Sequence, residues 1–240
     1  MKKENKLEMT GIRKGFGGKE VLDGVSLHVQ QGEHVTVLGP SGCGKSTLMN
    51  ILTGILTADA GKISVQGKIG YMQQKDLLLP WKTCLENVIL PDLLAGISRE
   101  SATERVQPYF RSFLLDGCQE KFPREMSGGM RQRASLLRTF VSSGDILLLD
   151  EPFGAVDSIT RGSLQQWLID VSAELGLTIL MITHDIEEAV LLSDRIYVLS
   201  EKPAAVRDEI VIGFGKDGKK DRLFEPEFLK IKKRILEDLK

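Results

Sequence analysis

One glycine-rich loop constrains the fold of this chain more than any other feature. Residues 39–47 match the pattern G-x-x-x-x-G-K-S/T, between a compact apolar segment at 34–38 and a segment with helical spacing at 46–56. Glycines let successive backbone N–H groups converge on phosphate oxygens, and the positive end of the following helix also attracts anions. The loop therefore predicts a nucleotide-binding protein with an α/β core.

Every residue of this loop is a candidate ligand of the nucleotide. Lys45 is expected to bring its ammonium to the β- and γ-phosphates, and Ser46 to offer a hydroxyl to Mg²⁺. Cys43 occupies a position at which the pattern allows any residue, and we interpret it as a small residue without a specific role. The candidate nucleotide-binding residues are Gly39, Pro40, Ser41, Gly42, Cys43, Gly44, Lys45, Ser46 and Thr47.

Two later apolar segments end in residues suited to catalysis. Residues 146–149 run into Asp150 and Glu151, and residues 178–183 run into His184. Ligands of open α/β sheets bind outside the carboxyl ends of the strands. We expect Asp150 to hold Mg²⁺, directly or through water, and Glu151 to orient or deprotonate the attacking water. His184 is expected near the same phosphate, because its strand is predicted to lie beside that of Asp150.

Local signals suggest where the other elements begin and end. Residues 5–38 show short strand patterns broken by glycine turns, and apolar strands alternate with helices up to Leu199, which indicates a mainly parallel sheet. The apolar face of the helix after the loop is expected to include Ile55. Ser98 is a candidate helix N-cap and Gly117 a candidate stop.

Ser127-Gly128-Gly129 precedes a segment of helical character at 130–141, and it allows two interpretations. The simpler one is a glycine turn before a helix. The other is a second phosphate site without a lysine, built from backbone N–H groups, the serine hydroxyl and the helix dipole.

Composition excludes several classes of protein. The formal net charge is −1, so the chain has no overall positive field to attract nucleic acid or an anionic membrane. No run of about 20 apolar residues is present, and the charged N-terminus is unlike a signal peptide. The 3 cysteines are widely spaced, which favours a reducing compartment over a disulfide framework. If the protein works at a membrane, we expect another chain to hold it there.

Taken in order, these motifs resemble the ATPase subunits of ABC transporters, over roughly residues 6–200. The resemblance implies an α/β P-loop NTPase core of RecA-like type, with an N-terminal antiparallel β subdomain and an inserted α-helical subdomain at about 81–140. Pro91 and Pro108 are expected to divide that insertion into short helices. ATP and Mg²⁺ are the implied ligands.

The resemblance also implies roles for residues that the patterns alone leave unexplained. Phe16 matches an aromatic residue that stacks on adenine, where tyrosine is usual. Gln74, rather than Gln73, matches a glutamine that senses Mg²⁺ and water, and so joins the catalytic and the metal-binding sets. Residues 127–129 match a signature that contacts the γ-phosphate held by the opposite subunit, and Asp157 matches a loop that crosses this interface.

Three short segments, at 78–81, 127–133 and 183–189, are similar to those of importer ATPases of the nitrate, sulfonate and taurine class. Some relatives in that class carry pyrimidine precursors. The likeness implies a homodimer with two ATPs at its interface, on the cytoplasmic face of the cell membrane. Its partners would be transmembrane permease subunits, with a solute-binding protein met only through them. Pro80 and Trp81 are expected to contact the permease. The alternative for Trp81 is a position in the core of the helical region.

The alternative function is an ABC-type ATPase acting on nucleic acid or ribosomes. DNA-repair members carry a long coiled-coil insertion between phosphate loop and signature, for which the segment between Thr47 and Ser127 is too short. Translation-factor members carry two such domains, and this chain has one. We therefore expect no nucleic-acid partner. Residues 201–240 are expected to form a C-terminal extension with a basic amphipathic helix beyond Pro226.

Overall fold

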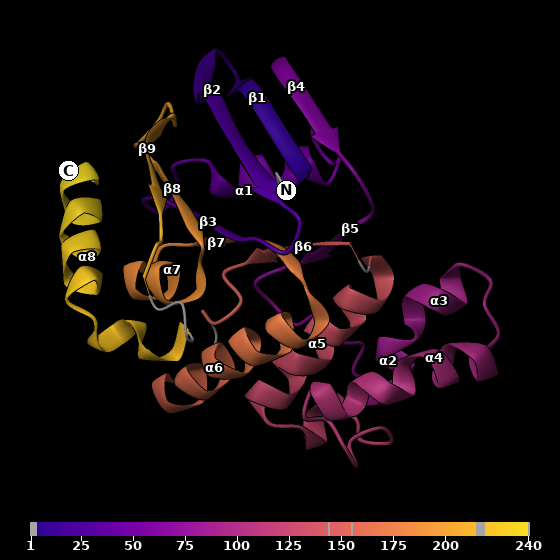
Figure 1. The fold of residues 1–240 in the computed structure, drawn as a ribbon. Helices are drawn as coiled ribbons and strands as arrows, with labels where there is room; N and C mark the ends of the chain where they lie inside the picture. Colours follow the sequence, from indigo (N-terminus) through magenta and orange to yellow (C-terminus); the bar gives the residue numbers. More distant parts are fainter. Residues whose placement is uncertain (1–3, 144, 155, 215–218, 240) are drawn as a thin grey trace.

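Two β-sheets organise the computed structural model, which describes residues 4–143, 145–154, 156–214 and 219–239 (Figure 1). The smaller sheet has the order β2-β1-β4 and the larger one β5-β6-β7-β3-β8-β9. Their strands are β1 (Asn5–Phe16), β2 (Lys19–Gln30), β3 (His34–Leu38), β4 (Ala60–Val65), β5 (Ile69–Met72), β6 (Ile146–Asp150), β7 (Thr178–Thr183), β8 (Arg195–Leu199) and β9 (Val206–Val211).

The larger sheet is parallel except for its edge strand β9, which pairs antiparallel with β8. Leu38 at the end of β3 is in register with Thr183, and Asp150 at the end of β6 is in register with Ile182. The carboxyl ends of these three strands therefore meet at one edge. The expectation that the strand before His184 lies beside that of Asp150 is confirmed.

Both faces of the parallel sheet are covered, which explains why its strands read as continuous apolar runs. In β6, Ile146 and Leu148 join the core shared with the small sheet and helix α1 (Lys45–Leu52). Leu147 and Leu149 join the opposite core, beneath helices α5 (Gly128–Ser143) and α6 (Ser158–Leu175). Figure 1 shows these helices on the side of the sheet away from β1, β2 and β4.

The small sheet differs in detail from the sequence pattern. β1 and β2 form one long antiparallel hairpin that runs through its glycines rather than stopping at them. Gly11 and Gly24 lie inside the strands with φ of +62° and +70°, and the pairing shifts register between Met9 and Ile12. Such bulges absorb an extra residue without ending a strand, so the expectation of short broken strands is wrong here.

Between β5 and β6 the described chain is helical, with α2 (Cys84–Val88), α3 (Leu90–Leu94), α4 (Arg99–Ser112), a 3₁₀ turn (Pro123–Glu125) and α5. Ser98 is the N-cap of α4, as expected, and accepts a hydrogen bond from the backbone N–H of Ser101. Pro108 lies inside α4 without ending it, and the helix ends at Ser112, before Gly117. The expectations that Pro108 divides the helical region and that Gly117 ends a helix are therefore wrong.

The helix after the phosphate loop is also shorter than its periodicity suggests. α1 ends at Leu52, and Ile55 is 64% exposed instead of joining the apolar face. The backbone turns at Gly54, which has a φ of +75° that favours glycine.

The C-terminal part packs against α7 (Ile186–Leu192), the helix that follows His184. It contains the 3₁₀ helix η2 (Lys219–Phe224) and α8 (Pro226–Asp238), the helix expected beyond Pro226. Residues 213–222 are rich in glycine, lysine and aspartate, and of these 215–218 lie outside the described residues. The buried Arg222 guanidinium donates to the carbonyls of Val190, Leu191 and Ser193 at the end of α7. A cation is favourable at that end of a helix.

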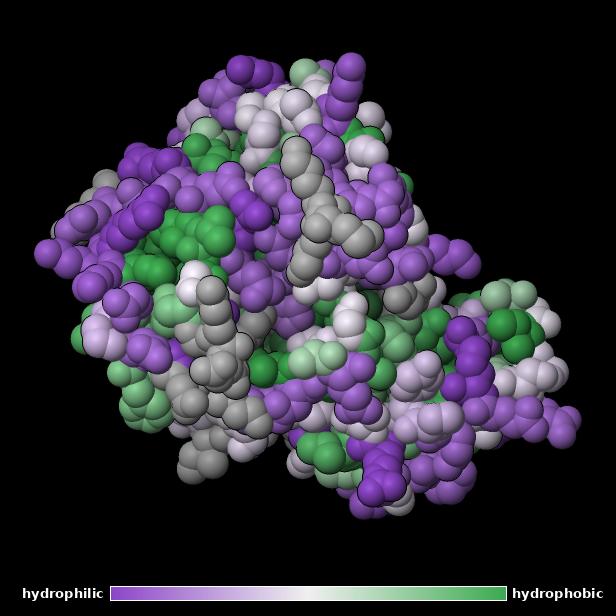
Figure 2. Space-filling view, in the orientation of Figure 1, coloured by the Kyte–Doolittle hydropathy of each residue, from purple (hydrophilic) through white to green (hydrophobic). Residues whose placement is uncertain are grey.

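Among the described residues, no helix has both the length and the apolar character that a bilayer-spanning segment requires. Figure 2 shows mostly hydrophilic side chains on one face of the molecule, with apolar ones in separate groups.

Candidate functional site

The phosphate loop connects β3 to α1 and requires glycine at defined places. Gly42 and Gly44 have φ of +77° and +131°, in the region that disfavours other residues. A Cβ at Gly44 would lie 3.0 Å from the side chains of Val21 and Leu22, so the loop packs directly on the start of β2. α1 begins at Lys45 with Gly44 as its N-cap, and its first N–H groups therefore face the loop.

Lys45 is buried, and its ammonium donates to the carbonyls of Gly39 at 2.7 Å and Pro40 at 2.9 Å. An ammonium has three donors, so one remains for a further acceptor. Cys43 is also buried, and a Cβ at Gly39 would meet its sulfur at 3.0 Å. These contacts fill the inner side of the loop and leave its outer side to a ligand.

The outer side of the loop opens onto a cleft of about 300 Å³. Its lining brings the loop together with the ends of β6 and β7 and with one residue that follows β8. The lining residues are Ser41, Gly42, Gly44, Lys45, Ser46, Thr47, Asp150, Glu151, Ile182 and Lys202.

Asp150 is held at the edge of this cleft by a partner from the neighbouring strand. The hydroxyl of Tyr71 on β5 donates to its Oδ2 at 3.0 Å. Burial raises the pKa of Asp150, while the Tyr71 hydrogen bond and the Lys45 charge act in the opposite direction. Burial, followed by the Asp150 charge, raises the pKa of Tyr71 too. The partial burial makes a nearby cation favourable for the Asp150 carboxylate.

The donors in this part of the cleft suit magnesium. The hydroxyl of Ser46 and the carboxylate of Asp150 both line it, and Mg²⁺ prefers oxygen ligands, usually one or two from protein carboxylates with phosphate oxygens and water. The residues present therefore fit the ion that the sequence implies.

Glu151 is the centre of a three-residue cluster. Its Oε1 lies 2.9 Å from Nδ1 of His184, and its Oε2 accepts a hydrogen bond from Nε2 of Gln74 at 3.0 Å. Glu151 has a φ of +44°, a conformation that costs energy for any residue but glycine and is often retained at functional sites. The structure thus brings together the three residues expected to act in catalysis, which are separated in sequence.

Phe16 lies outside the cleft, at the end of β1 where the hairpin turns. Its side chain is 48% exposed, and the ammonium of Lys14 lies 5.5 Å from the ring centroid. The hairpin partner strand β2 contacts Gly44 through Val21, so Phe16 belongs to an element that touches the phosphate loop. One aromatic ring is thus partly open to solvent on the hairpin that packs against the phosphate loop.

The signature residues are not part of the cleft. The hydroxyl of Ser127 accepts a hydrogen bond from Met130 N–H at the start of α5, and a Cβ at Gly129 would meet Thr160 at 3.0 Å. Asp157 is the exposed N-cap of α6. Ser127 and Gly128 are exposed as well. These residues could therefore contact a ligand in the cleft of another copy of the chain, or one in their own cleft only after a rearrangement.

Pro80 and Trp81 are exposed, with 70% of the Trp81 surface accessible, so Trp81 is not a core residue. The chain between Gln74 and Trp81 is attached to α5 by contacts that the sequence did not reveal. Arg138 donates to the carbonyl of Asp76 at 2.7 Å, and the Arg131 guanidinium pairs with the Asp76 carboxylate at 3.1 Å.

Sequence reasoning missed two residues that line the cleft, Ile182 and Lys202, and one residue outside the lining that holds Asp150, Tyr71. Tyr71 lies on β5, and only the sheet order places that strand beside β6. Lys202 belongs to the turn after β8 and to no motif, so no sequence signal pointed to it.

A glycine loop leading from a central parallel strand into a helix, with carboxylates at the same edge of the sheet at the end of another parallel strand, defines a P-loop nucleotide-binding protein. Within that class, the chain belongs to the ABC transporter family, whose model matches residues 22–154.

Two relatives and one solved structure illustrate the likeness. The formylaminopyrimidine import ATP-binding protein ThiZ of Halalkalibacterium halodurans is 45% identical over 76% of this chain and 74% of its own length. The taurine import ATP-binding protein TauB of Escherichia coli O157:H7 is 35% identical over 96% of this chain and 95% of its own. The dimeric, post-hydrolysis ATP-binding cassette MJ0796 bound to ADP and Pi superposes with a TM-score of 0.72, at 29% identity over 87% of this chain and 100% of its own.

Proposed function

We propose that this chain is the ATP-binding and ATP-hydrolysing subunit of an ABC importer that takes up a small solute through a separate permease. One observation carries the catalytic part: the Glu151 carboxylate is held between Gln74 and His184 at the cleft that the phosphate loop lines. The importer part is supported by relatives named as import ATP-binding proteins.

Residues in and around the cleft have separate roles in phosphoryl transfer. The loop N–H groups and the third donor of Lys45 bind the β- and γ-phosphates. Glu151 accepts a proton from the attacking water, and Gln74 and His184 orient the carboxylate. When bound, Mg²⁺ would be held by Ser46, Asp150 and Gln74 and would neutralise charge on the phosphates. Phe16 offers its exposed ring to the adenine.

The complete catalytic site requires a second copy of the chain. Ser127, Gly128 and Asp157 are exposed and lie outside the cleft of their own chain. A two-fold homodimer would present them to the ATP held by the partner, giving two equivalent sites. The dimeric state of the similar cassette bound to ADP and Pi supports this arrangement.

The exposed pair Pro80–Trp81 is the proposed contact with the permease. It follows Gln74, and Arg131 and Arg138 attach the intervening segment to α5, whose first turn carries the signature. A change at the γ-phosphate can therefore reach the permease contact through one packed unit. The chain would lie at the cytoplasmic face of the membrane, with the solute-binding protein on the far side of the permease.

For the solute, we propose the class that includes nitrate, sulfonates, taurine and pyrimidine precursors, which the named substrates of the two relatives support. The alternative of an ATPase acting on nucleic acid or ribosomes is disfavoured by these import relatives and by a net charge of −1.

Replacing Glu151 by glutamine tests the catalytic assignment. Glutamine keeps the shape but cannot accept the proton, so ATP binding should persist while hydrolysis falls by roughly 10²-fold or more. Steady-state phosphate release and ATP titrations of the purified subunit measure the two effects. Glu120→Gln, at an exposed position in the helical region, is the matched control. Turnover of Glu151→Gln close to that of wild type would refute the role of Glu151.

A further inference from the structure

Lys202 lines the phosphate cleft although it belongs neither to the phosphate loop nor to the strand ends that complete the cleft. It lies in the turn between β8 and β9, more than 150 residues from Lys45 in sequence. β8 is hydrogen-bonded to β3, which leads into the phosphate loop, and this pairing brings the turn to the nucleotide site.

The turn that carries Lys202 is anchored at both ends. At its far end the buried Ala204 donates its N–H to the carbonyl of Val21 at 2.8 Å and accepts from the N–H of Asp23 at 2.8 Å. At its near end the Ser200 hydroxyl accepts from the N–H of Ala205 at 3.0 Å. Val21 is also one of the residues on which Gly44 packs. The same strand therefore positions both the loop and the turn.

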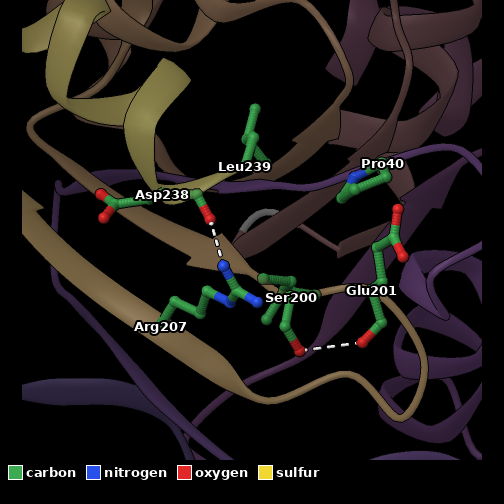
Figure 3. A pocket seen from close by; sticks show the side chains of 7 residues that line it. Pro40, Ser200, Glu201, Arg207, Asp238 and Leu239 are labelled. Atoms are coloured by element: carbon green, nitrogen blue, oxygen red, sulfur yellow. Dashed lines mark hydrogen bonds between the residues drawn. The ribbon is translucent and has the colours of Figure 1, made fainter.

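The opposite side of the turn faces the phosphate loop and the end of α8. A small pocket of about 50 Å³ lies between Pro40 of the loop, Glu201 of the turn and the end of α8 (Figure 3). There Arg207 donates to the backbone carbonyl of Asp238 at 2.9 Å. Glu201 lines this pocket and Lys202 lines the phosphate cleft, so these two consecutive residues lie on opposite sides of the turn.

With a nucleotide bound, its phosphates would add negative charge to that of Asp150 and Glu151, more than Mg²⁺ and Lys45 together offset. Asp150 and Glu151 contribute two carboxylates, and two of the three donors of Lys45 are taken by carbonyls of its own loop. Lys202 is exposed, and within the described parts of the chain its ammonium has no ion pair or hydrogen bond. A lysine ammonium is a compact charge on a flexible stem, suited to a phosphate oxygen.

We propose that Lys202 binds a phosphate group of the nucleotide from the same chain as the phosphate loop, as a second cation besides Lys45. The inference rests on the proposed function, because it requires a nucleotide in this cleft. It adds a contact supplied by a turn that lies outside the nucleotide-binding motifs.

The expected effect is moderate and depends on salt. A lysine in a water-filled cleft acts through a screened charge, so losing it should weaken nucleotide binding by about tenfold, or ~1.4 kcal/mol. The effect should shrink towards about 1 M salt, where the Debye length falls to roughly 3 Å.

Calorimetric titration of the purified chain tests the proposal with Lys202→Met, which keeps the stem and removes the charge. MgADP is titrated into each protein, and MgATP into the same proteins carrying Glu151→Gln. Lys202→Arg should retain the wild-type affinity within about threefold, because it keeps the cation. The control Lys233→Met removes the same charge from an 80% exposed side chain on α8 and should change nothing.

A tenfold loss for both nucleotides assigns Lys202 to the α- or β-phosphate, and a loss for MgATP alone assigns it to the γ-phosphate. Equal affinities of Lys202→Met, Lys233→Met and wild type for both nucleotides would overturn the proposal. In that case Lys45→Ala still decides the proposed function, since it should abolish binding regardless of Lys202. If wild type itself binds neither nucleotide, the proposed function fails, and the inference fails with it.

Discussion

Replacing each of the 2 tryptophans by alanine distinguishes a partner contact from a core position. Trp81 is 70% exposed, whereas Trp167 is 8% exposed, packs edge-on against Phe113 with centroids 5.4 Å apart, and donates its Nε1–H to the carbonyl of Ser112 at 3.0 Å. The same substitution at the two positions should therefore have different effects on the isolated chain.

The magnitudes follow from burial. A tryptophan buries roughly 200 Å² when it is fully packed, so the covered part of Trp81 amounts to about 60 Å². At about 25 cal/mol per Å², Trp81→Ala should lower the free energy of unfolding by about 1.5 kcal/mol. Trp167→Ala should lower it by about 3–5 kcal/mol, because it opens a cavity in a packed core.

Urea unfolding followed by circular dichroism measures both values on the isolated chain. Capture of the permease by the folded Trp81→Ala subunit should weaken by about 2 kcal/mol or more, the threshold for an interface hot spot. ATP binding should remain close to that of wild type. The reasoning is refuted if Trp81→Ala destabilises the chain as much as Trp167→Ala, or if it leaves permease capture unchanged.

Three further substitutions test the dimer and the electrostatics of the cleft. Neither Lys45→Ala nor Ser127→Arg should hydrolyse ATP alone, but mixing them should restore about a quarter of wild-type activity, because half of randomly paired dimers contain one intact composite site; a mixture as inactive as its components would contradict the shared site. Asp150→Asn should raise the melting temperature of the nucleotide-free chain at pH 7 while weakening Mg²⁺-dependent ATP binding by roughly tenfold or more. The pKa of Asp150 is raised on folding, so its ionised form costs stability above that pKa, and the advantage of asparagine should disappear as the pH falls and the carboxyl is protonated. Calorimetric melting temperatures of Asp150→Asn and wild type, at pH 7 and in acid, measure this difference in stability. A lower melting temperature for Asp150→Asn than for wild type at pH 7 would contradict the prediction.

Much of the cleft could be predicted because its chemistry is local in sequence. The phosphate loop needs glycines, a lysine and a hydroxyl within a few consecutive residues, and Asp150 and Glu151 directly follow an apolar strand. Periodicity was less reliable at element ends. Ile55 continues a helical pattern beyond α1, and Pro108 is accommodated inside α4, since tertiary packing can outweigh local preference.

The sequence by itself determined that a phosphate-binding loop joins a buried strand to a helix, and that carboxylates and a histidine follow two later apolar strands. Only the tertiary structure decided which side chains meet there. The order of strands brings Tyr71 to Asp150 and the turn carrying Lys202 to the cleft. The exposure of Trp81, in the helical region, is likewise a property of the tertiary structure. Sheet order depends on contacts between residues far apart in the chain, and the short-range spacing of apolar and polar residues does not specify which strands pair.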